Sequence, residues 1–317
     1  MSARIFLYPR LGRVRIGNRY LFGSGLGNCL FPWARAVVAS HHYGLPLLPP
    51  VWTRFTSGAG FRTALKGIFG PKQSNRTYRG LFNEPPFLPN QVDQIWKIQS
   101  SPKRDESLLS NLVKTGVKHD TVVVFHSPRG QFASLLQDQQ LVTEAFCKMI
   151  KPEILNGATD RPYTRFACHV RLGDFNPAGV ERATTLTNAR LPMEWYIAKI
   201  RQIGERWPGS TIDLFSDGTE RELAPFLELS NVRRLTFENP LADLLAMSRS
   251  SLLVCNGSTF SAWAAYLGNM PTIWFPTKLG WPLHPGIRDY EIESSLDEPL
   301  SRRFIQNVES PLPNRIN

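Results

Sequence analysis

Short apolar, β-rich segments alternate with helix-like segments through the second half of this chain. Three of the β-rich segments have the composition of buried strands: "TRFACHV" (164–170), "STIDLFSD" (210–217) and "SLLVCN" (251–256). Between them lie "PMEWYIAKIRQIGERW" (192–207) and "PLADLLAMSRS" (240–250), whose apolar residues recur at helical spacing. Strands that alternate with helices form parallel sheets covered by helices. We therefore expect an α/β fold.

The first half contains units of the same kind. "RYLF" (19–22) resembles a strand, and a glycine-rich loop after it leads into an amphipathic helix within "GSGLGNCLFPWARAVVAS" (23–40). Another strand runs into a polar loop in "DTVVVFHSPRGQF" (120–132), and "DQQLVTEAFCKMI" (138–150) predicts the helix that follows. Residues about 45–105 are rich in proline, glycine and aromatic residues and lack periodicity, so we interpret them as an irregular insertion.

A chain of 317 residues exceeds what one hydrophobic core ordinarily supports, so we expect two domains. The segment "KPEILNGATDRP" (151–162) is interpreted as the linker between them. The predicted domains are 1–158, a Rossmann-like domain that contains the irregular insertion, and 159–317. The second domain is expected to end with "PTIWFP" (271–276) as its final strand, followed by a C-terminal tail.

The formal net charge of +11, from 37 Lys and Arg against 26 acidic residues, predicts an anionic partner. The basic residues are scattered, and we find neither a stripe of them with interleaved aromatic residues nor a zinc-finger or RNA-recognition motif. We therefore expect no nucleic acid as a partner. A nucleotide-linked substrate and an anionic membrane surface would each account for the excess charge, and both remain open.

The four cysteines lie beside apolar residues without a C-x-x-C pair, which suits a reduced protein and gives no metal-ligand spacing. The first residues lack the continuous apolar segment of a signal peptide, and no eighteen apolar residues run together. We expect a cytoplasmic protein, with peripheral docking to the inner face of the membrane through its positive charge as a further hypothesis. The sequence gives no indication of the oligomeric state.

Polar clusters follow four of the predicted strands. They lie at 126–131, 169–174, 216–217 and 256–261. In parallel α/β sheets the ligand binds beyond the carboxyl ends of the strands, so these clusters form the candidate site.

Arg171 and Gly173 are candidates for ligand binding in the second cluster. A guanidinium offers a rigid fork of donors that matches phosphate oxygens, and a glycine lets the backbone approach a ligand closely. Asp174 is placed to orient the arginine or to accept a proton. For this motif alone, an Arg-Asp pair that closes the loop is the alternative.

Ser258, Thr259 and Ser261 begin a predicted helix, whose first backbone N–H groups have no partner within the helix and therefore suit an anion. Simple N-capping by a serine is the alternative. Together with Arg171, this helix start describes a pyrophosphate site. Asp243, on the preceding helix, carries a carboxylate that suits the N1–H and amino groups of guanine, while a capping or solvent-facing role is the alternative.

Six blocks of the sequence, in the same order, resemble the motifs of the α-1,2-fucosyltransferases, the family 11-like members of the GT-B fucosyltransferases. "HVRLGDF" resembles H-x-R-x-G-D-[YF], and "GLGNCLFPWARA" resembles G-L-G-N-Q-L-F-x-x-A with Cys29 in place of glutamine. The other blocks are "FHSPRGQF", "LPMEWYIAKI", "LFSDG" and "DLLAMSRSSLLVCNGSTFSAWAAYLG". They span most of the chain from Gly25 to about Pro276, and the conjunction is more specific than any one block.

The resemblance implies a GT-B fold, with two facing Rossmann-like domains, the first on the acceptor side and the second binding the GDP-sugar. It also implies transfer of fucose from GDP-fucose with inversion, α-1,2 to galactose of an oligosaccharide or lipid-linked glycan acceptor, and no metal or other cofactor. The sequence has no D-x-D motif of the metal-dependent transferases. Another GDP-sugar, an α-1,6 or α-1,3 linkage, and a catalytically inactive glycan- or nucleotide-binding module remain alternatives.

The resemblance assigns roles to the residues that match its motifs. Arg171 would bind the β-phosphate and steady the leaving GDP, and His169 would contact the nucleotide, partly through its backbone. Asp243 corresponds to an acid that binds guanine in the related α-1,6-fucosyltransferases. The other residues expected to bind the GDP-sugar are Gly173, Asp217, Asn256, Ser258, Thr259 and Ser261 in the second domain, and Gly25, Gly27 and Asn28 in the first.

Three residues are candidates for the general base. Asp174 is first because it lies in the motif, Glu181 in the following loop is second, and His126 from the other domain is third. An arginine-orienting Asp174, a solvated Glu181 and a structural His126 are the alternatives. Gly218 in place of the second aspartate of F-S-D-D, and Ala262 in place of the first tryptophan of a W-W pair, put the acceptor in question more than the donor.

Overall fold

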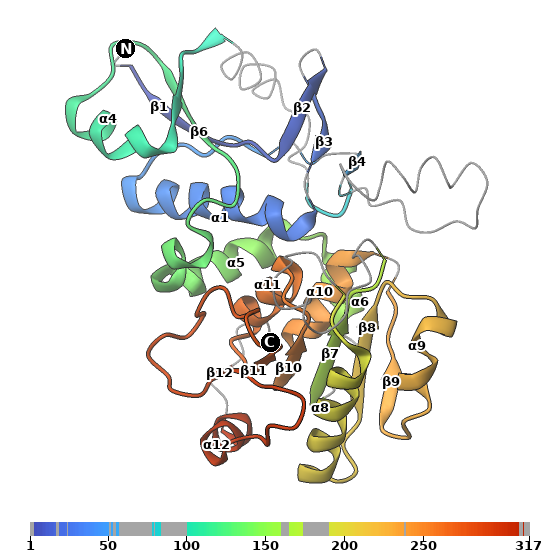
Figure 1. Ribbon diagram of the computed structural model, residues 1–317. Helices are drawn as coiled ribbons and strands as arrows, with labels where there is room; N and C mark the ends of the chain where they lie inside the picture. Colours follow the sequence, from blue (N-terminus) through green and yellow to red (C-terminus); the bar gives the residue numbers. More distant parts are fainter. Residues whose placement is uncertain are drawn as a thin grey trace. The chain divides into compact units, whose positions relative to one another are not determined.

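The computed structural model has two compact units, residues 1–151 and 152–317. It describes residues 3–16, 19–23, 25–50, 52, 55–56, 78, 80–83, 100–159, 165–173, 190–237, 239–310 and 313. The predicted α/β fold with parallel sheets is confirmed (Figure 1). The segment interpreted as a linker is instead largely helical: α6 (Pro152–Thr159) belongs to the second unit, and it begins with a proline, which is well suited to the first turn of a helix.

The second unit is built on a six-stranded parallel sheet, all of whose strand pairs are parallel. From one edge to the other its strands are β12 (Glu291–Glu293), β11 (Thr272–Trp274), β10 (Leu252–Cys255), β7 (Phe166–Val170), β8 (Ile212–Ser216) and β9 (Val232–Arg234). The chain starts in the middle at β7, moves outward to β9, and then returns to β10 before moving outward to β12. β7 and β10 therefore flank the topological switch point, where doubly wound sheets bind their ligands.

Helices cover both faces of this sheet. One face packs against α8 (Met193–Arg206), α9 (Glu220–Leu227) and α12 (Arg302–Glu309), which share a core with the strands. On the other side, α10 (Pro240–Ser248) packs against both α6 and α11 (Thr259–Gly268). Side-chain oxygens of Asn239, Ser258 and Ser301 cap α10, α11 and α12 by accepting backbone N–H groups, as N-cap residues do.

The first unit contains two smaller sheets. One is parallel, with β6 (Thr121–Phe125) between β1 (Ile5–Pro9) and β5 (Lys103–Asp105). The other consists of β2 (Gly12–Ile16), β3 (Arg19–Gly23) and β4 (Phe55–Thr56), with β2 and β3 antiparallel. Its remaining elements are α1 (Leu26–Tyr43), η1 (Glu106–Leu108), α4 (Leu109–Thr115), η2 (Gln131–Ser134), η3 (Leu136–Asp138) and α5 (Gln139–Met149). The predicted strand–loop–helix at 19–40 is present, but its strand does not belong to the parallel sheet.

Two further expectations need correction. "PTIWFP" forms β11, but β12 follows it, so it is not the final strand. The irregular insertion, 45–105, contains the two-residue strand β4, the edge strand β5, and isolated bridges from Leu47 to Leu7 and from Phe82 to Ile150. Most of the rest of it lies outside the described residues.

A buried charge cluster ties the end of α11 to the segment before β12. Nδ1 of His284 lies 3.1 Å from Oε1 of Glu291, and Nε2 lies 2.7 Å from Oδ1 of Asn269. The Asn269 amide group donates to the carbonyl of Pro313, at 3.3 Å, so its oxygen faces the imidazole as an acceptor. Because both ring nitrogens face oxygen acceptors, we infer that His284 carries both protons and forms an ion pair with Glu291. The two side chains are 4% and 5% exposed.

Candidate functional site

The predicted residues of the second unit gather at the carboxyl ends of β7 and β10. His169 is the penultimate residue of β7, and Arg171 is the first residue after that strand. Asn256 is the first residue after β10. The sheet register places Cys168 beside Val254, so the two strands end next to each other. Residues 256–261 then lead into α11, whose first turn lies at the same edge.

A chain of hydrogen bonds links the two strand ends. The backbone N–H of Ser258 donates to Oδ1 of Asn256 at 2.9 Å, so that atom is the amide oxygen. The hydroxyl of Ser261 donates to the same oxygen at 2.8 Å. Because its only proton is used there, Ser261 must accept the third bond, from Nδ1–H of His169 at 2.7 Å.

This network fixes the state of the His169 ring. Burial, and then the positive charge of Arg171, lower the pKa of His169 to about 3, against a smaller opposing effect of Asp217. The ring is therefore neutral near pH 7, and since Nδ1 carries the proton, Nε2 is a hydrogen-bond acceptor. His169 thus suits a hydroxyl group of a ligand better than a phosphate oxygen.

Three donors at this edge have no partner among the described residues. Asn256 is only 3% exposed, and its buried Nδ2 has no acceptor among the residues that the structure describes. No acceptor binds the backbone N–H groups of Thr259 and Phe260 either, in the described part of the chain. A buried amide without a partner is costly in a folded protein, so a ligand that supplies oxygen acceptors would be favoured here. The start of α11 adds its positive dipole end to the same site.

Asp217, which follows β8, holds Arg171. Its Oδ2 lies 3.1 Å from Nε of Arg171, and its Oδ1 accepts the N–H groups of Leu172 at 2.8 Å and Gly173 at 3.1 Å. Burial raises the pKa of Asp217, but the Arg171 guanidinium and the two N–H groups more than offset this, so the pKa lies below its ordinary value. The carboxylate therefore stays charged and fixes both the arginine and the loop beside it.

Two glycines near the strand ends have little room for a side chain. A Cβ atom on Gly173 would lie 2.6 Å from Oδ2 of Asp217, and one on Gly218 would lie 2.6 Å from Cδ1 of Leu172. A larger residue at position 173 would crowd the Asp217 carboxylate, whereas at position 218 it would meet the end of the flexible Leu172 side chain. Gly218, which departs from the motif of the resembled family, is thus matched to Leu172 in this chain.

Asp243 lies in the first turn of α10, at the same edge of the sheet as the other residues. Burial raises the pKa of its carboxyl group to about 7, against a smaller opposite effect of the Phe237 N–H. That N–H, 3.3 Å from Oδ1, is its one hydrogen-bond partner among the described residues. The capping residue of α10 is Asn239, so Asp243 does not serve as the N-cap.

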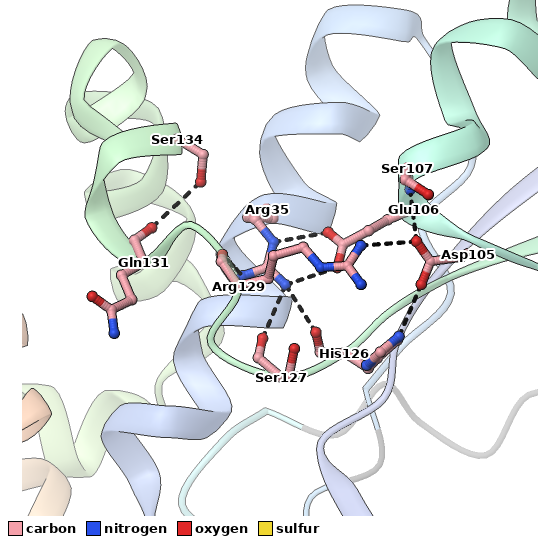
Figure 2. A network of polar contacts seen from close by, with 9 residues as sticks. All are labelled: Arg35, Asp105, Glu106, Ser107, His126, Ser127, Arg129, Gln131 and Ser134. Carbon is pink, nitrogen blue, oxygen red and sulfur yellow. Dashed lines mark hydrogen bonds and ion pairs between the residues drawn. The ribbon is translucent and has the colours of Figure 1, made fainter.

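The predicted residues of the first unit occupy two places. Gly25 is the N-cap of α1, and Gly27 and Asn28 lie in the first turn of that helix. His126 follows β6, and its Nε2 lies 2.9 Å from Oδ2 of Asp105 (Figure 2). The two other candidates for the general base, Asp174 and Glu181, lie outside the described residues.

Arg234, which the sequence did not suggest, lies at the carboxyl end of β9. One of its terminal nitrogens donates to the carbonyl of Gly218 at 2.9 Å, and its buried Nε has no partner among the described residues. The sequence "VRR" does not alternate between apolar and polar residues, so it did not predict a strand. Nothing in the sequence therefore indicated that Arg234 lies at the carboxyl edge of the sheet.

The described residues also limit what else the chain holds. Among them, no group of three His, Cys, Asp or Glu side chains is placed to hold a metal ion. None of the helices in these segments combines the length and the hydrophobicity that a membrane crossing needs.

No protein-family model and no curated protein matches the chain. Solved structures with a similar fold include the fucosyltransferase NodZ from Bradyrhizobium, with a TM-score of 0.47 and 14% identity over 83% of this chain and 93% of that one. NodZ α-1,6-fucosyltransferase soaked with GDP-fucose has a TM-score of 0.46 and 16% identity, over 86% and 95% of the two chains. POFUT1 in its apo form has a TM-score of 0.46 and 13% identity, over 86% and 98%. Likeness of this degree does not place the chain in a family.

Proposed function

We propose that the second unit binds the diphosphate of a GDP-sugar at its topological switch point, and that the chain transfers fucose from GDP-fucose to a hydroxyl group of a glycan. The observation that carries the diphosphate is the set of donors at the ends of β7 and β10. Arg171 is held there by Asp217, and the buried amide of Asn256 and two N–H groups of α11 lack acceptors among the described residues. The fucose and the guanine rest on the motif resemblance.

The same donors explain how the reaction would be accelerated. The acceptor oxygen forms a bond to the anomeric carbon of fucose while the bond from that carbon to the β-phosphate oxygen breaks, and the electron pair leaves with GDP. Negative charge therefore grows on the diphosphate, where Arg171 and the start of α11 stabilise it. Pre-organised donors of this kind are commonly worth about 10²–10³-fold in rate each. On this account the leaving group needs no metal ion.

The linkage and the acceptor are the finer part of the proposal. The motifs favour an α-1,2 bond to galactose, on an oligosaccharide or a lipid-linked glycan. The donor site is equally compatible with an α-1,6 or α-1,3 linkage.

The proposal predicts that the protein transfers fucose from GDP-fucose to a β-galactoside and continues to do so in excess EDTA. The measurement is product formation with a panel of galactose- and N-acetylglucosamine-terminated oligosaccharides, followed by NMR assignment of the new linkage. GDP-mannose in place of GDP-fucose is the matched control for the donor sugar. Binding of GDP without turnover of any acceptor would replace the transferase with a binding module, and activity restored only by Mn²⁺ would contradict the metal-free mechanism.

A second prediction concerns Asp243. Its ionised carboxylate accepts the N1–H and amino groups of guanine, and the protonated form cannot accept both. Since burial raises the pKa of this group to about 7, a proton must leave before guanine binds. The affinity for GDP should therefore be constant above about pH 8 and fall toward tenfold per pH unit below about pH 6. Isothermal titration calorimetry across this range measures it.

Asp243→Asn is the matching variant, because it keeps the shape of the side chain and removes its titration. It should weaken GDP binding by about 10- to 100-fold near pH 8, the worth of hydrogen bonds to a charged group, and abolish the pH dependence. The affinity for UDP, which lacks the guanine donors, should change little. An unaltered preference for GDP over UDP in this variant would rule out guanine recognition by Asp243.

A further inference from the structure

The loop that follows β11 brings a lysine to the edge of the second sheet where the candidate diphosphate site lies. β11 is next to β10, and the register pairs Trp274 with Cys255, so the two strands end at the same level. Lys278 is the fourth residue after β11. A Cβ atom added to Gly257 would lie 3.0, 3.1 and 3.2 Å from Cβ, Cγ and Cδ of Lys278. The aliphatic part of the lysine therefore packs across the backbone of Gly257, the residue next to Asn256.

Hydrogen bonds fix the backbone on both sides of Lys278. Its own N–H donates to the carbonyl of Phe275 at 3.0 Å, and its carbonyl accepts the N–H of Gly280 at 2.9 Å. The N–H of the next residue, Leu279, donates at 2.8 Å to Oε1 of Glu293, the last residue of β12. The loop is thus attached to the neighbouring strand, and the start of the lysine side chain has a fixed place.

Gly257 makes the close approach of the lysine possible. Its φ is +77°, in the left-handed region that residues with a side chain rarely adopt. The carbon atoms of Lys278 occupy the space that a side chain at this position would need. Since Nζ is only two bonds beyond Cδ, the ammonium group stays beside the loop that carries the amide of Asn256 and leads into α11.

The charges already at this edge do not balance a diphosphate. Arg171 is paired with Asp217, which stays ionised, and His169 is neutral near pH 7, so these three side chains have no net positive charge. The diphosphate of a GDP-sugar carries one negative charge on each phosphate, which cations of the protein must balance where no metal ion does so. Arg234 lies at the end of β9, two strands away from β7. Lys278 packs on the loop after β10, the strand next to β7.

The surroundings of Lys278 suit an ammonium group that meets an anion. Burial lowers the pKa of Lys278, and the carboxylate of Glu293 offsets part of this effect. A phosphate beside the ammonium group would raise the pKa again, because a nearby opposite charge favours the charged form. Protonation of the lysine and binding of an anion therefore support each other.

We propose that Lys278 is a further residue of the donor site, and that its ammonium group binds the diphosphate from the side of β10 while Arg171 binds it from the side of β7. The inference rests on the proposed function, which supplies the diphosphate. As the bond from fucose to the β-phosphate oxygen breaks, the growing negative charge on GDP is stabilised by two cations. The lysine acts as a point charge and complements the planar fork of the arginine.

Chemical labelling tests the contact on the unaltered protein. Lys199 and Lys278 are the only lysines in the sequence from 152 to 317, and Lys199 is fully buried. Reductive methylation with formaldehyde and a borohydride, followed by peptide mass spectrometry, measures the rate at which each lysine reacts. Inorganic pyrophosphate or GDP, at about ten times its Kd, should slow the reaction of Lys278 about tenfold by mass action. Lys114, exposed on α4, should react at an unchanged rate.

Lys278→Met tests the charge, because methionine keeps an unbranched stem that can pack on Gly257. Calorimetry should show GDP binding weakened by about tenfold, within the worth of a hydrogen bond to a charged group. The affinity for guanosine, which lacks the phosphates, should not change. Lys278→Arg, which restores a cation, should recover most of the lost affinity for GDP. Arg303→Met, which removes an exposed cation from α12, is the matched control and should bind GDP as the wild type does.

The outcomes separate this inference from the proposed function. If pyrophosphate protects Lys278 but GDP does not bind, the anion site stands and the guanine nucleotide is contradicted. If GDP binds without protecting Lys278, or binds Lys278→Met as it binds the wild type, the inference is overturned and the proposed donor site remains. An equal loss of affinity for GDP and guanosine in Lys278→Met would also overturn it, because the lysine would then only shape the loop.

Discussion

Arg171→Lys is expected to slow fucose transfer by about 100- to 1,000-fold, the usual cost of removing a donor that stabilises developing negative charge. A lysine keeps the charge but lacks the Nε group that lies 3.1 Å from Oδ2 of Asp217 in the ion pair that holds Arg171. It also offers one point of charge where the guanidinium offers a planar fork of donors. The measurement is kcat/KM for GDP-fucose, with thermal unfolding recorded on the same sample.

Arg201→Lys is the matched control. Arg201 belongs to α8, one of the helices that pack on the sheet, but its side chain is exposed and lies away from the strand ends. It should retain wild-type kinetics and wild-type stability. Arg171→Lys should unfold at the wild-type temperature within a few degrees, since the side chain is partly exposed. Transfer by Arg171→Lys at near the wild-type rate would remove this residue from the mechanism.

His284→Leu is expected to destabilise the second unit by about 3–5 kcal/mol, the cost of removing one partner from a buried ion pair. The Glu291 carboxylate would stay buried without the imidazolium 3.1 Å away, and the amide oxygen of Asn269 would lose its donor. This corresponds to a fall in the melting temperature of about 10 °C for a unit of this size. Thermal and urea unfolding measure the change.

His284→Leu combined with Glu291→Leu is the informative control. If the pair is charged, removing both partners should recover much of the lost stability, because no uncompensated charge then remains buried. The cluster lies beyond the C-terminal end of α11, so both proteins should transfer fucose at the wild-type rate well below their unfolding transitions. Equal destabilisation of the single and the double variant would contradict a charged His284.

The centre of the second sheet could be predicted from the sequence, and its edges could not. β7 and β10 are buried on both faces and are apolar apart from His169, which makes them easy to identify. β9 and β12 have the sequences "VRR" and "EIE", in which charged residues dominate, as suits edge strands that must avoid pairing with other chains. β1 was missed because an apolar stretch of five residues next to arginines gave no helical or alternating pattern.

The sequence indicated which residues lie at the candidate site better than it indicated which of their side chains contact one another. The rule that ligands bind beyond strand ends correctly grouped His169, Arg171 and Asn256 at one edge. It could not show that the carboxylate paired with Arg171 is Asp217, because that contact depends on the register that sets Val170 beside Ser216. The Asp105–His126 pair could not be predicted either. Asp105 lies at the end of a region without periodicity, where no strand was expected.

The crossover from β9 back to β10 also has a consequence for how the protein acquires its activity during synthesis. A nascent chain that has emerged only as far as β9 contains three of the six strands of the sheet. It contains Arg171 but not yet Asn256 or the N–H groups at the start of α11. On the proposed function, the diphosphate site would be complete only once β10 pairs with β7 and α11 forms after it. A nucleotide that binds only the completed site would stabilise the folded unit and so favour the last step of folding.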